Sequence, residues 1–338
     1  MASNINNTIT LVIFVTPYFN LATTTAFLDP FRAANYLIGE SRFKWSFVSA
    51  TGGDIPSSNG MSIATRSIED AKGDEPDIAV VSSSWSPERY QDETHIKALQ
   101  RWAKVGVKVG ALDTGGLILA QAGLLRGKRA TVHYEHIDAF IELFPNVTVT
   151  ESLFVRDGSV FTCCGGIASV DLALNIMRDL TGEGVANAVA RYLFHHEVRG
   201  PEASQNPALQ EPFGQTTPNV VRRAIDLMET HLENPLSIPE ICKKLNISQR
   251  HLGRLFKTYV RKTAVLYYRD IRLDRARGLV TQTELKLSEV SVASGFSSQV
   301  HFSRAYHERF GLSPKQDRTD GRIPFEFRAW PMYNPERV

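Results

Sequence analysis

The sequence predicts two domains, an α/β domain followed by an all-α domain, on three observations. Apolar runs of strand length alternate with stretches of helical periodicity over residues 8–197. A proline-rich segment without periodicity, 198–218, follows and is expected to be the linker. Residues 219–318 show short helical patterns separated by polar turns and no strand pattern, and 319–338 are expected to form a tail.

The strands of the first domain are predicted from nearly continuous β-branched and apolar runs. They are expected at 8–15, 45–50, 77–82 and 107–112, with helices at 22–37, 93–103, 115–122, 167–180 and 185–195. Such strands between helices indicate a parallel sheet covered on both faces, in a flavodoxin-like arrangement. Three further extended runs, 147–150, 153–156 and 159–163, are expected to include a hairpin that turns at Asp157-Gly158.

Charge is distributed unevenly along the 338 residues. Residues 1–214 hold 17 basic and 23 acidic side chains, a net charge of −6, whereas residues 215–338 hold 21 and 13, a net charge of +8. The basic excess of the C-terminal part would attract phosphates, which favours DNA as a partner.

The cellular compartment of the protein is predicted from its N-terminal residues and its cysteines. Residues 1–7 lack a basic region and the apolar run 9–15 is closed by Pro17, so we expect neither a signal peptide nor a membrane span. Cys163, Cys164 and Cys242 cannot all pair, and adjacent cysteines are poor disulfide formers. We therefore expect a cytoplasmic protein with reduced thiols that has no contact with membranes.

The first motif of the C-terminal region is a predicted helix-turn-helix. A helix is expected to start near Pro239, turn at Asn246-Ile247 and continue as a second helix capped by Ser248. The exposed face of the second helix would present polar and basic side chains, Gln249, Arg250, Arg254 and Lys257. Arginine can bridge guanine and glutamine can bridge adenine in the major groove.

The same arrangement returns about fifty residues later, over 287–310. Gly295 is expected in the left-handed turn and Ser297 as the helix cap. The side chains expected toward DNA are Ser298, Gln299, His301 and Arg304. A long helix over 265–280 would hold the two motifs at a fixed separation, suited to successive major grooves about 34 Å apart.

The C-terminal region resembles the AraC/XylS family of regulators in its motifs Gly295-Phe-Ser-Ser-Gln299, His301-Phe-Ser-Arg304 and Phe310-Gly-Leu-Ser-Pro314. The resemblance implies double-stranded DNA, RNA polymerase and a second copy of the chain as partners. It places base contacts on Gln249, Arg250, Arg254, Ser298, Gln299 and Arg304. Arg254 and Arg304 can equally hold a phosphate. The family follows Ser-Pro with an aromatic residue and arginine, where this chain has Lys315-Gln-Asp-Arg318, which leaves the end of the last helix open.

In the first domain, the strand 107–112 is expected to turn sharply into a helix at Asp113–Gly116. Such an elbow exposes one side chain above the sheet, beside the N–H groups of the helix N-terminus. Asp113 is neither cysteine nor serine and has no base partner within its motif, so it does not suit nucleophilic catalysis. The alternative is that Asp113 caps the helix that starts at Gly115.

Residues 8–195 resemble the class I glutamine amidotransferase-like fold of PfpI type, in the form fused to AraC-type domains. The motifs are Ala120-Gln-Ala-Gly-Leu-Leu-Arg-Gly127 and Ala130-Thr-Val-His133. The resemblance implies that the catalytic cysteine of relatives corresponds to Asp113, so that no catalytic residue remains while the pocket persists. Asp29 would take the place of the acidic neighbour of that cysteine, or simply lie exposed on its helix.

Ligand-binding residues are predicted from the topology, which places a ligand above the carboxyl ends of the strands. The candidates are Asp113, Thr114, Trp85, His133, Cys163 and Phe19, with Tyr134 beside them. A carboxylate among aromatic rings suits a cation, and the resemblance implies an amino-acid-like or quaternary ammonium effector. His195, His196 and Glu197 do not form a convincing ligand set, so we expect no metal and no cofactor.

We therefore predict a sequence-specific DNA-binding transcriptional regulator, an activator that is not an enzyme and that responds to a small nitrogenous metabolite. The alternative is a bifunctional hydrolase or amidase that uses Cys163 or Cys164 as nucleophile.

Overall fold

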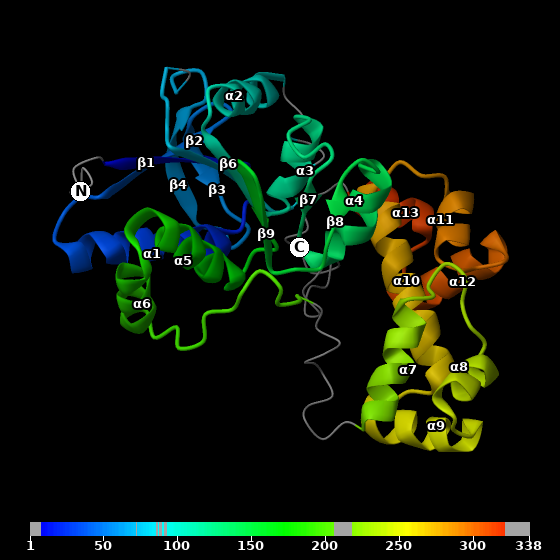
Figure 1. Cartoon of the computed structure of the whole chain (residues 1–338). Coiled ribbons are helices and arrows are strands. Elements are labelled where there is room, and N and C mark those ends of the chain that lie inside the picture. The colour runs from blue at the N-terminus through cyan, green and yellow to red at the C-terminus, as the bar shows by residue number, and fades with distance from the viewer. Residues whose placement is uncertain are drawn as a thin grey trace. The chain divides into compact units, whose positions relative to one another are not determined.

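The computed structural model describes residues 8–71, 73–85, 87, 90, 93–205 and 218–321, which fall into two compact units (Figure 1). One unit contains the described residues up to Gln205 and the other those from 218 onward. The predicted linker residues 206–217 and tail residues 322–338 lie outside the described residues. Of the helices in these ranges, none combines the length and the apolar character needed to cross a bilayer.

The N-terminal unit is built on an eight-stranded sheet in the order β3-β4-β2-β1-β5-β6-β10-β9. Its strands are β1 (Ile9–Val15), β2 (Phe43–Ser49), β3 (Gly53–Pro56), β4 (Ser62–Ser67), β5 (Ile78–Ser83), β6 (Lys108–Asp113), β9 (Phe154–Asp157) and β10 (Val160–Cys163). The strands from β4 to β10 run parallel, and β3 and β9 pair antiparallel at the two edges. The predicted parallel sheet and the hairpin at Asp157-Gly158 are confirmed.

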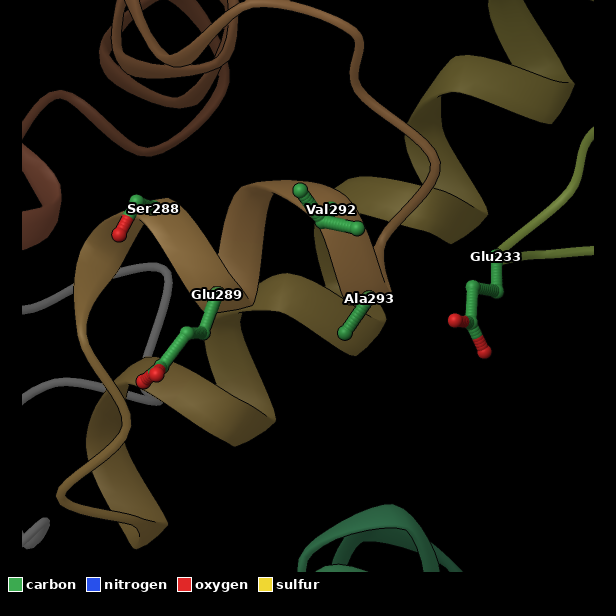
Figure 2. Close-up of a pocket in the computed structure, with 5 residues that line it drawn as sticks. All are labelled: Glu233, Ser288, Glu289, Val292 and Ala293. Atoms are coloured by element: carbon green, nitrogen blue, oxygen red, sulfur yellow. The ribbon is translucent and has the colours of Figure 1, made fainter.

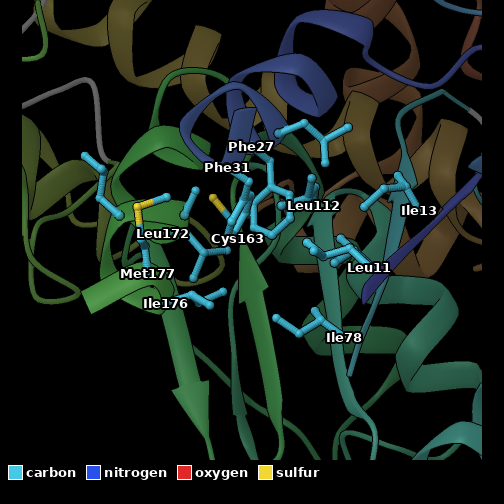
Figure 3. Close-up of a cluster of buried hydrophobic side chains, with 14 of the residues drawn as sticks. Leu11, Ile13, Phe27, Phe31, Ile78, Leu112, Cys163, Leu172, Ile176 and Met177 are labelled. Atoms are coloured by element: carbon cyan, nitrogen blue, oxygen red, sulfur yellow. The ribbon is translucent and has the colours of Figure 1, made fainter. Parts of the chain in front are cut away.

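Helices cover both faces of this sheet (Figure 1). They are α1 (Leu21–Ile38), α2 (Glu93–Lys104), α3 (Gly115–Gln121), α4 (Ile137–Leu143), α5 (Ala168–Thr181) and α6 (Glu183–Tyr192). Because strand side chains alternate between faces, Leu11 and Ile13 pack under α1 and α5, whereas Val12 and Phe14 pack under α2 and α3. Figure 3 shows the first of these cores, in which Phe27 and Phe31 of α1 meet side chains of α5.

Several elements were not predicted. The β3–β4 hairpin is mostly exposed or half-buried, so it lacks the apolar runs on which the strand prediction depended. A two-stranded sheet of β7 (Arg129–Ala130) and β8 (Thr148–Val149) adjoins α4. Residues 198–205, expected in the linker, lie against the N-terminal unit, where Gln205 Nε2 donates to the Val132 carbonyl at 2.9 Å.

The C-terminal unit is all helical. Its helices are α7 (Asn219–Glu229), α8 (Ile238–Leu245), α9 (Gln249–Leu255), α10 (Ala264–Gln282), α11 (Leu287–Ala293), α12 (Gln299–Phe310) and α13 (Pro314–Gly321), with a π-helical turn at Phe256–Val260. Two separate cores form, one among α7, α8, α9 and the start of α10, the other among the rest of α10, α11 and α12. Tyr268 belongs to the first core and Leu273 to the second, so α10 is shared by both helix-turn-helix motifs, as predicted.

Gly295 ends α11 in a left-handed turn, with φ of 73°. A Cβ atom at this position would lie 2.4 Å from the Leu232 carbonyl oxygen. We expect Gly295→Ala to lower the free energy of unfolding by about 2 kcal/mol, from the left-handed backbone and this contact together. The matched control is Gly253→Ala, because Gly253 lies inside α9 with nothing within 4 Å of its Cβ position. That change is expected to stabilise the chain by roughly 0.5–1 kcal/mol, and thermal unfolding measures both. Equal effects of the two changes would contradict this account.

Candidate functional site

The predicted elbow lies at the junction of β6 and α3. Asp113, the last residue of β6, has φ of 59°, and α3 begins two residues later. The helix starts with glycine because a Cβ at Gly115 would lie 2.5 Å from the Val81 carbonyl oxygen. A residue held in left-handed backbone by such close packing is typical of functional sites. The elbow therefore presents Asp113 at the carboxyl end of the parallel strands.

The Asp113 side chain is buried, with 4% of its surface exposed. Asn20 Nδ2 donates to Asp113 Oδ2 at 3.1 Å, and the Asn20 side-chain oxygen accepts from the Thr23 N–H as the cap of α1. Gly165 closes the other side, since a Cβ there would lie 3.1 Å from Asp113 Cβ. The first turn of α1 and the loop after β10 thus position the carboxylate.

Burial raises the pKa of Asp113 to about 6, because the charged carboxylate loses solvation. The electrostatic interaction with His133 and the hydrogen bonds from Asn20 and the Thr114 backbone oppose this rise. At pH 7 the carboxylate is mostly ionised, although its hydrogen-bond donors are neutral groups. A buried anion in this state would be stabilised by a cation.

The other predicted ligand residues divide into two groups. Thr114 lies beside the carboxylate and its Oγ1 donates to the Ser84 carbonyl at 2.6 Å. His133 is half-buried, its N–H donates to the Asp113 carbonyl at 3.4 Å, and its ring lies 4.6 Å from that of Tyr134. Trp85 is half-buried one residue after Ser84. These residues lie around the elbow.

Phe19 and Cys163 form the second group. Phe19 is fully buried and Cys163 is 1% exposed, and both belong to the hydrophobic core under α1 and α5. Figure 3 shows Cys163 among the apolar side chains of this core. Both side chains pack in this core, and their assignment to the ligand site stays a prediction.

The surroundings of Cys163 and Cys164 do not favour the alternative in which one of these cysteines is a nucleophile. Cys164 is buried, and its pKa is raised far above the ordinary value by its interaction with Cys163, by burial and by the charge of Asp113. The reactive species of cysteine is the thiolate, which this environment disfavours. Cys163 Sγ lies 3.8 Å from Ser169 Oγ inside the core.

Asp29 does not reach the elbow. Its carboxylate pairs with Arg32 Nε at 2.5 Å on the exposed side of α1, and 43% of its side-chain surface is exposed. The neighbour of Asp113 from this part of the chain is instead Asn20, which the sequence reasoning missed. The signal available for Asn20 was its position directly before the helix, where asparagine is a common cap.

A second buried carboxylate, Asp171, was also missed. It is fully buried on α5 and accepts hydrogen bonds from His195 Nε2 at 2.7 Å and from Arg199 N, Nε and Nη2 at 2.9, 3.0 and 2.6 Å. These bonds hold the segment after α6 against α5. His195 is therefore engaged in a hydrogen bond with Asp171, and the described residues contain no group of three side chains suited to a metal.

In the C-terminal unit, α8 and α9 form the first helix-turn-helix as predicted. Ser237 and Glu240 make a reciprocal cap at the start of α8, and Asn246 ends it with φ of 55°. Ser248 caps α9 by accepting from the His251 N–H at 3.2 Å. The predicted DNA-contacting residues of this helix, Gln249, Arg250 and Arg254, are all exposed.

The second motif, α11 and α12, differs from the prediction at its cap. Ser298, not Ser297, caps α12 and accepts from the His301 N–H at 3.5 Å. The turn after Gly295 holds one residue more than the turn after Asn246, which moves the cap by one position. Gln299 and Arg304 are exposed, and Arg304 Nε pairs with Glu308 at 3.2 Å.

A pocket of about 380 Å³ lies beside α11 (Figure 2). It is lined by Glu233, Ser288, Glu289, Val292 and Ala293. Glu289 is engaged in capping α11 by accepting from the Lys286 N–H at 2.7 Å. None of the predicted ligand residues lines this pocket, and the elbow remains the candidate ligand site.

Comparison with known proteins agrees with both units. Residues 11–179 match the DJ-1/PfpI family and residues 241–320 a helix-turn-helix domain family. The HTH-type transcriptional regulator CdhR of Pseudomonas aeruginosa is 36% identical over 303 residues, 89% of each chain. GbdR, an HTH-type transcriptional regulator of the same species, is 33% identical over 300 residues, 89% of this chain and 81% of that one.

A solved structure supports the fold of the N-terminal unit. The crystal structure of an AraC family transcriptional regulator from Pseudomonas putida has 25% sequence identity and a TM-score of 0.50, covering 55% of this chain and 99% of the other. The predicted regulator is thus confirmed. The chain belongs to the AraC-type helix-turn-helix transcriptional regulators that carry an N-terminal DJ-1/PfpI domain.

Proposed function

We propose that this regulator is controlled by a small nitrogenous cation that binds at Asp113, and that its N-terminal unit binds this effector without catalysis. The observation that carries the proposal is the buried, mostly ionised carboxylate of Asp113, whose hydrogen-bond donors are neutral. A ligand ammonium or quaternary ammonium group would supply the opposite charge. The ring of Tyr134, which lies 4.6 Å from that of His133, suits such a group, because a cation is attracted to an aromatic face.

Two observations, the identity of the elbow residue and the state of the Cys164 thiol, support the proposal that the N-terminal unit is not catalytic. Asp113 replaces a thiol or hydroxyl at the elbow, and Cys164 is held in its protonated form. Activation of transcription, assembly as a homodimer and contact with RNA polymerase stay predictions from the family. So do the assignments of individual DNA-contacting residues.

Thermal unfolding of the full chain with candidate effectors tests the proposal. The set should include arginine, betaines and polyamines, with neutral and anionic analogues of similar size. A ligand at 100 times its Kd stabilises the folded protein by about 2.7 kcal/mol, which corresponds to several degrees in Tm. We expect at least one cationic compound to raise Tm and Asp113→Asn to remove that rise.

The control is Asp29→Asn, which also removes a carboxylate from the N-terminal unit but acts on the exposed pair with Arg32. It should keep the ligand-induced rise. A rise of equal size in Asp113→Asn would show that the effector binds elsewhere, and a rise with anionic compounds alone would contradict a cationic effector.

A further inference from the structure

The two helices predicted to contact DNA share four of the first seven residues, counted from their caps. From its cap, α9 begins Ser248-Gln-Arg-His-Leu-Gly-Arg254 and α12 begins Ser298-Gln-Val-His-Phe-Ser-Arg304. Each serine caps its helix by accepting from the histidine three residues later. Leu252 and Phe302 are the buried residues at the same position of the two helices. The two helices therefore share the same phase about their axes.

Within this repeat, glutamine follows the cap and arginine stands six residues after it in both helices. The intervening exposed residue, two positions after the cap, differs: it is Arg250 in α9 and Val300 in α12. Val300 is an apolar side chain with 76% of its surface exposed. At this position α12 therefore presents an apolar side chain where α9 presents a basic one.

The helix geometry places this variable position at the centre of the exposed face. Residues advance by about 100° each, so the buried Leu252 and Phe256 and the partly buried Leu255 cluster on one side of α9. The side opposite to them holds Arg250 and, one turn later, Arg254. By the same count, Val300 and Arg304 lie opposite Phe302, Ala305 and Tyr306, which are buried. The residue at the centre of the exposed face is therefore arginine on α9 and valine on α12.

We propose that the difference between Arg250 and Val300 sets the sequence preferences of the two helices apart. It rests on the proposed reading of DNA by α9 and α12. The operator then consists of two related elements that share the positions contacted by the common glutamine and arginine. The elements differ at the base pair contacted by this position, where Arg250 selects guanine through its O6 and N7 atoms and Val300 selects thymine through its 5-methyl group.

Selection of binding sites from random DNA by the full chain tests this inference. We expect two enriched elements that differ at the base pair contacted by this position, guanine in one and thymine in the other. In Val300→Arg the thymine should change to guanine, with a preference of roughly 5- to 100-fold, while the other element stays the same. The reciprocal Arg250→Val should change guanine to thymine in the other element only. Because α9 already has arginine at this position, a Val300→Arg protein that binds no DNA would contradict the equivalence.

A second measurement isolates the methyl group. Replacing the thymine by uracil removes only that methyl and should weaken wild-type binding about 3-fold. Val300→Ala should respond much less to uracil, whereas Val292→Ala should respond like the wild type. Val292 is a matched control, since it is also an exposed valine of this motif but lies on α11. An equal response of wild type and Val300→Ala would overturn the inference. Failure of the wild type to enrich any sequence would instead count against DNA reading itself.

Discussion

Replacing Asp317 with alanine is expected to lower the free energy of unfolding of the C-terminal unit by roughly 3–5 kcal/mol. Asp317 is fully buried on α13, and its Oδ2 accepts from Arg277 Nε at 2.9 Å and from the Tyr306 hydroxyl at 2.8 Å. Alanine would leave the Arg277 guanidinium and the buried Tyr306 hydroxyl without this acceptor. Since a third of the Arg277 side chain is exposed, we expect a value near the lower end. Chemical denaturation followed by circular dichroism measures the loss.

Asp317→Asn and Asp274→Ala make the test specific. Asparagine keeps an acceptor oxygen without the charge, so its loss should be smaller than that of alanine. Asp274 pairs with Arg309 at 2.6 Å, but 54% of its side chain is exposed, and its replacement should cost about 1 kcal/mol or less. Similar losses for Asp317→Ala and Asp274→Ala would contradict the role given to burial.

Asp113→Asn is expected to raise the free energy of unfolding of the N-terminal unit by about 3 kcal/mol at pH 7 to 8. The pKa of Asp113 is about 6 in the folded chain against an ordinary value of 3.8, and this difference corresponds to about 3 kcal/mol. Because the folded pKa is the higher one, the folded chain binds the proton more tightly. The wild type is therefore most favoured, with respect to this group, below pH 3.8, and it loses that stability as the pH rises to 6 and beyond.

Urea denaturation between pH 4 and 8 measures this effect. The tryptophans of the N-terminal unit, Trp45, Trp85 and Trp102, provide the fluorescence signal. The curve of Asp113→Asn minus wild type should rise from pH 4 to pH 6.5 and then level off. Asp29→Asn should give a flat difference of under about 1 kcal/mol, as expected for an exposed pair. A flat difference for Asp113→Asn as well would mean that Asp113 ionises without cost.

The features that could be predicted from the sequence are those that depend on interactions among neighbouring residues. The cap Ser248, the left-handed Gly295 and the elbow at Asp113 each follow from the chemistry of a few neighbouring residues, and the structure shows all three. The parallel sheet followed from strands that are buried on both faces. The cap of α12 was misplaced by one residue because Ser297 and Ser298 are adjacent and equally able to cap.

The remaining site residues depend on contacts that are distant in sequence. Asn20 meets Asp113 across 93 residues, and Arg199 meets Asp171 across 28. The hydrophobic periodicity of a sequence contains no information about pairs that lie so far apart along the chain. Cys163 and Phe19 were assigned to the ligand site because both lie near the carboxyl ends of strands. Whether a side chain at such a place faces the core depends on the packing of α1 and α5.

Because α10 contributes to both cores, it fixes the distance and the angle between the two helix-turn-helix motifs. Tyr268 and Ile271 are held by the first helix-turn-helix, and Leu273 and Ala276 by the second, so one continuous stretch of backbone sets the angle between α9 and α12. Inserting one residue between Ile271 and Leu273 would turn one motif by about 100° against the other and lengthen their separation by about 1.5 Å. On the proposal that α9 and α12 each read one operator element, the length of this single helix sets the spacing of the two elements.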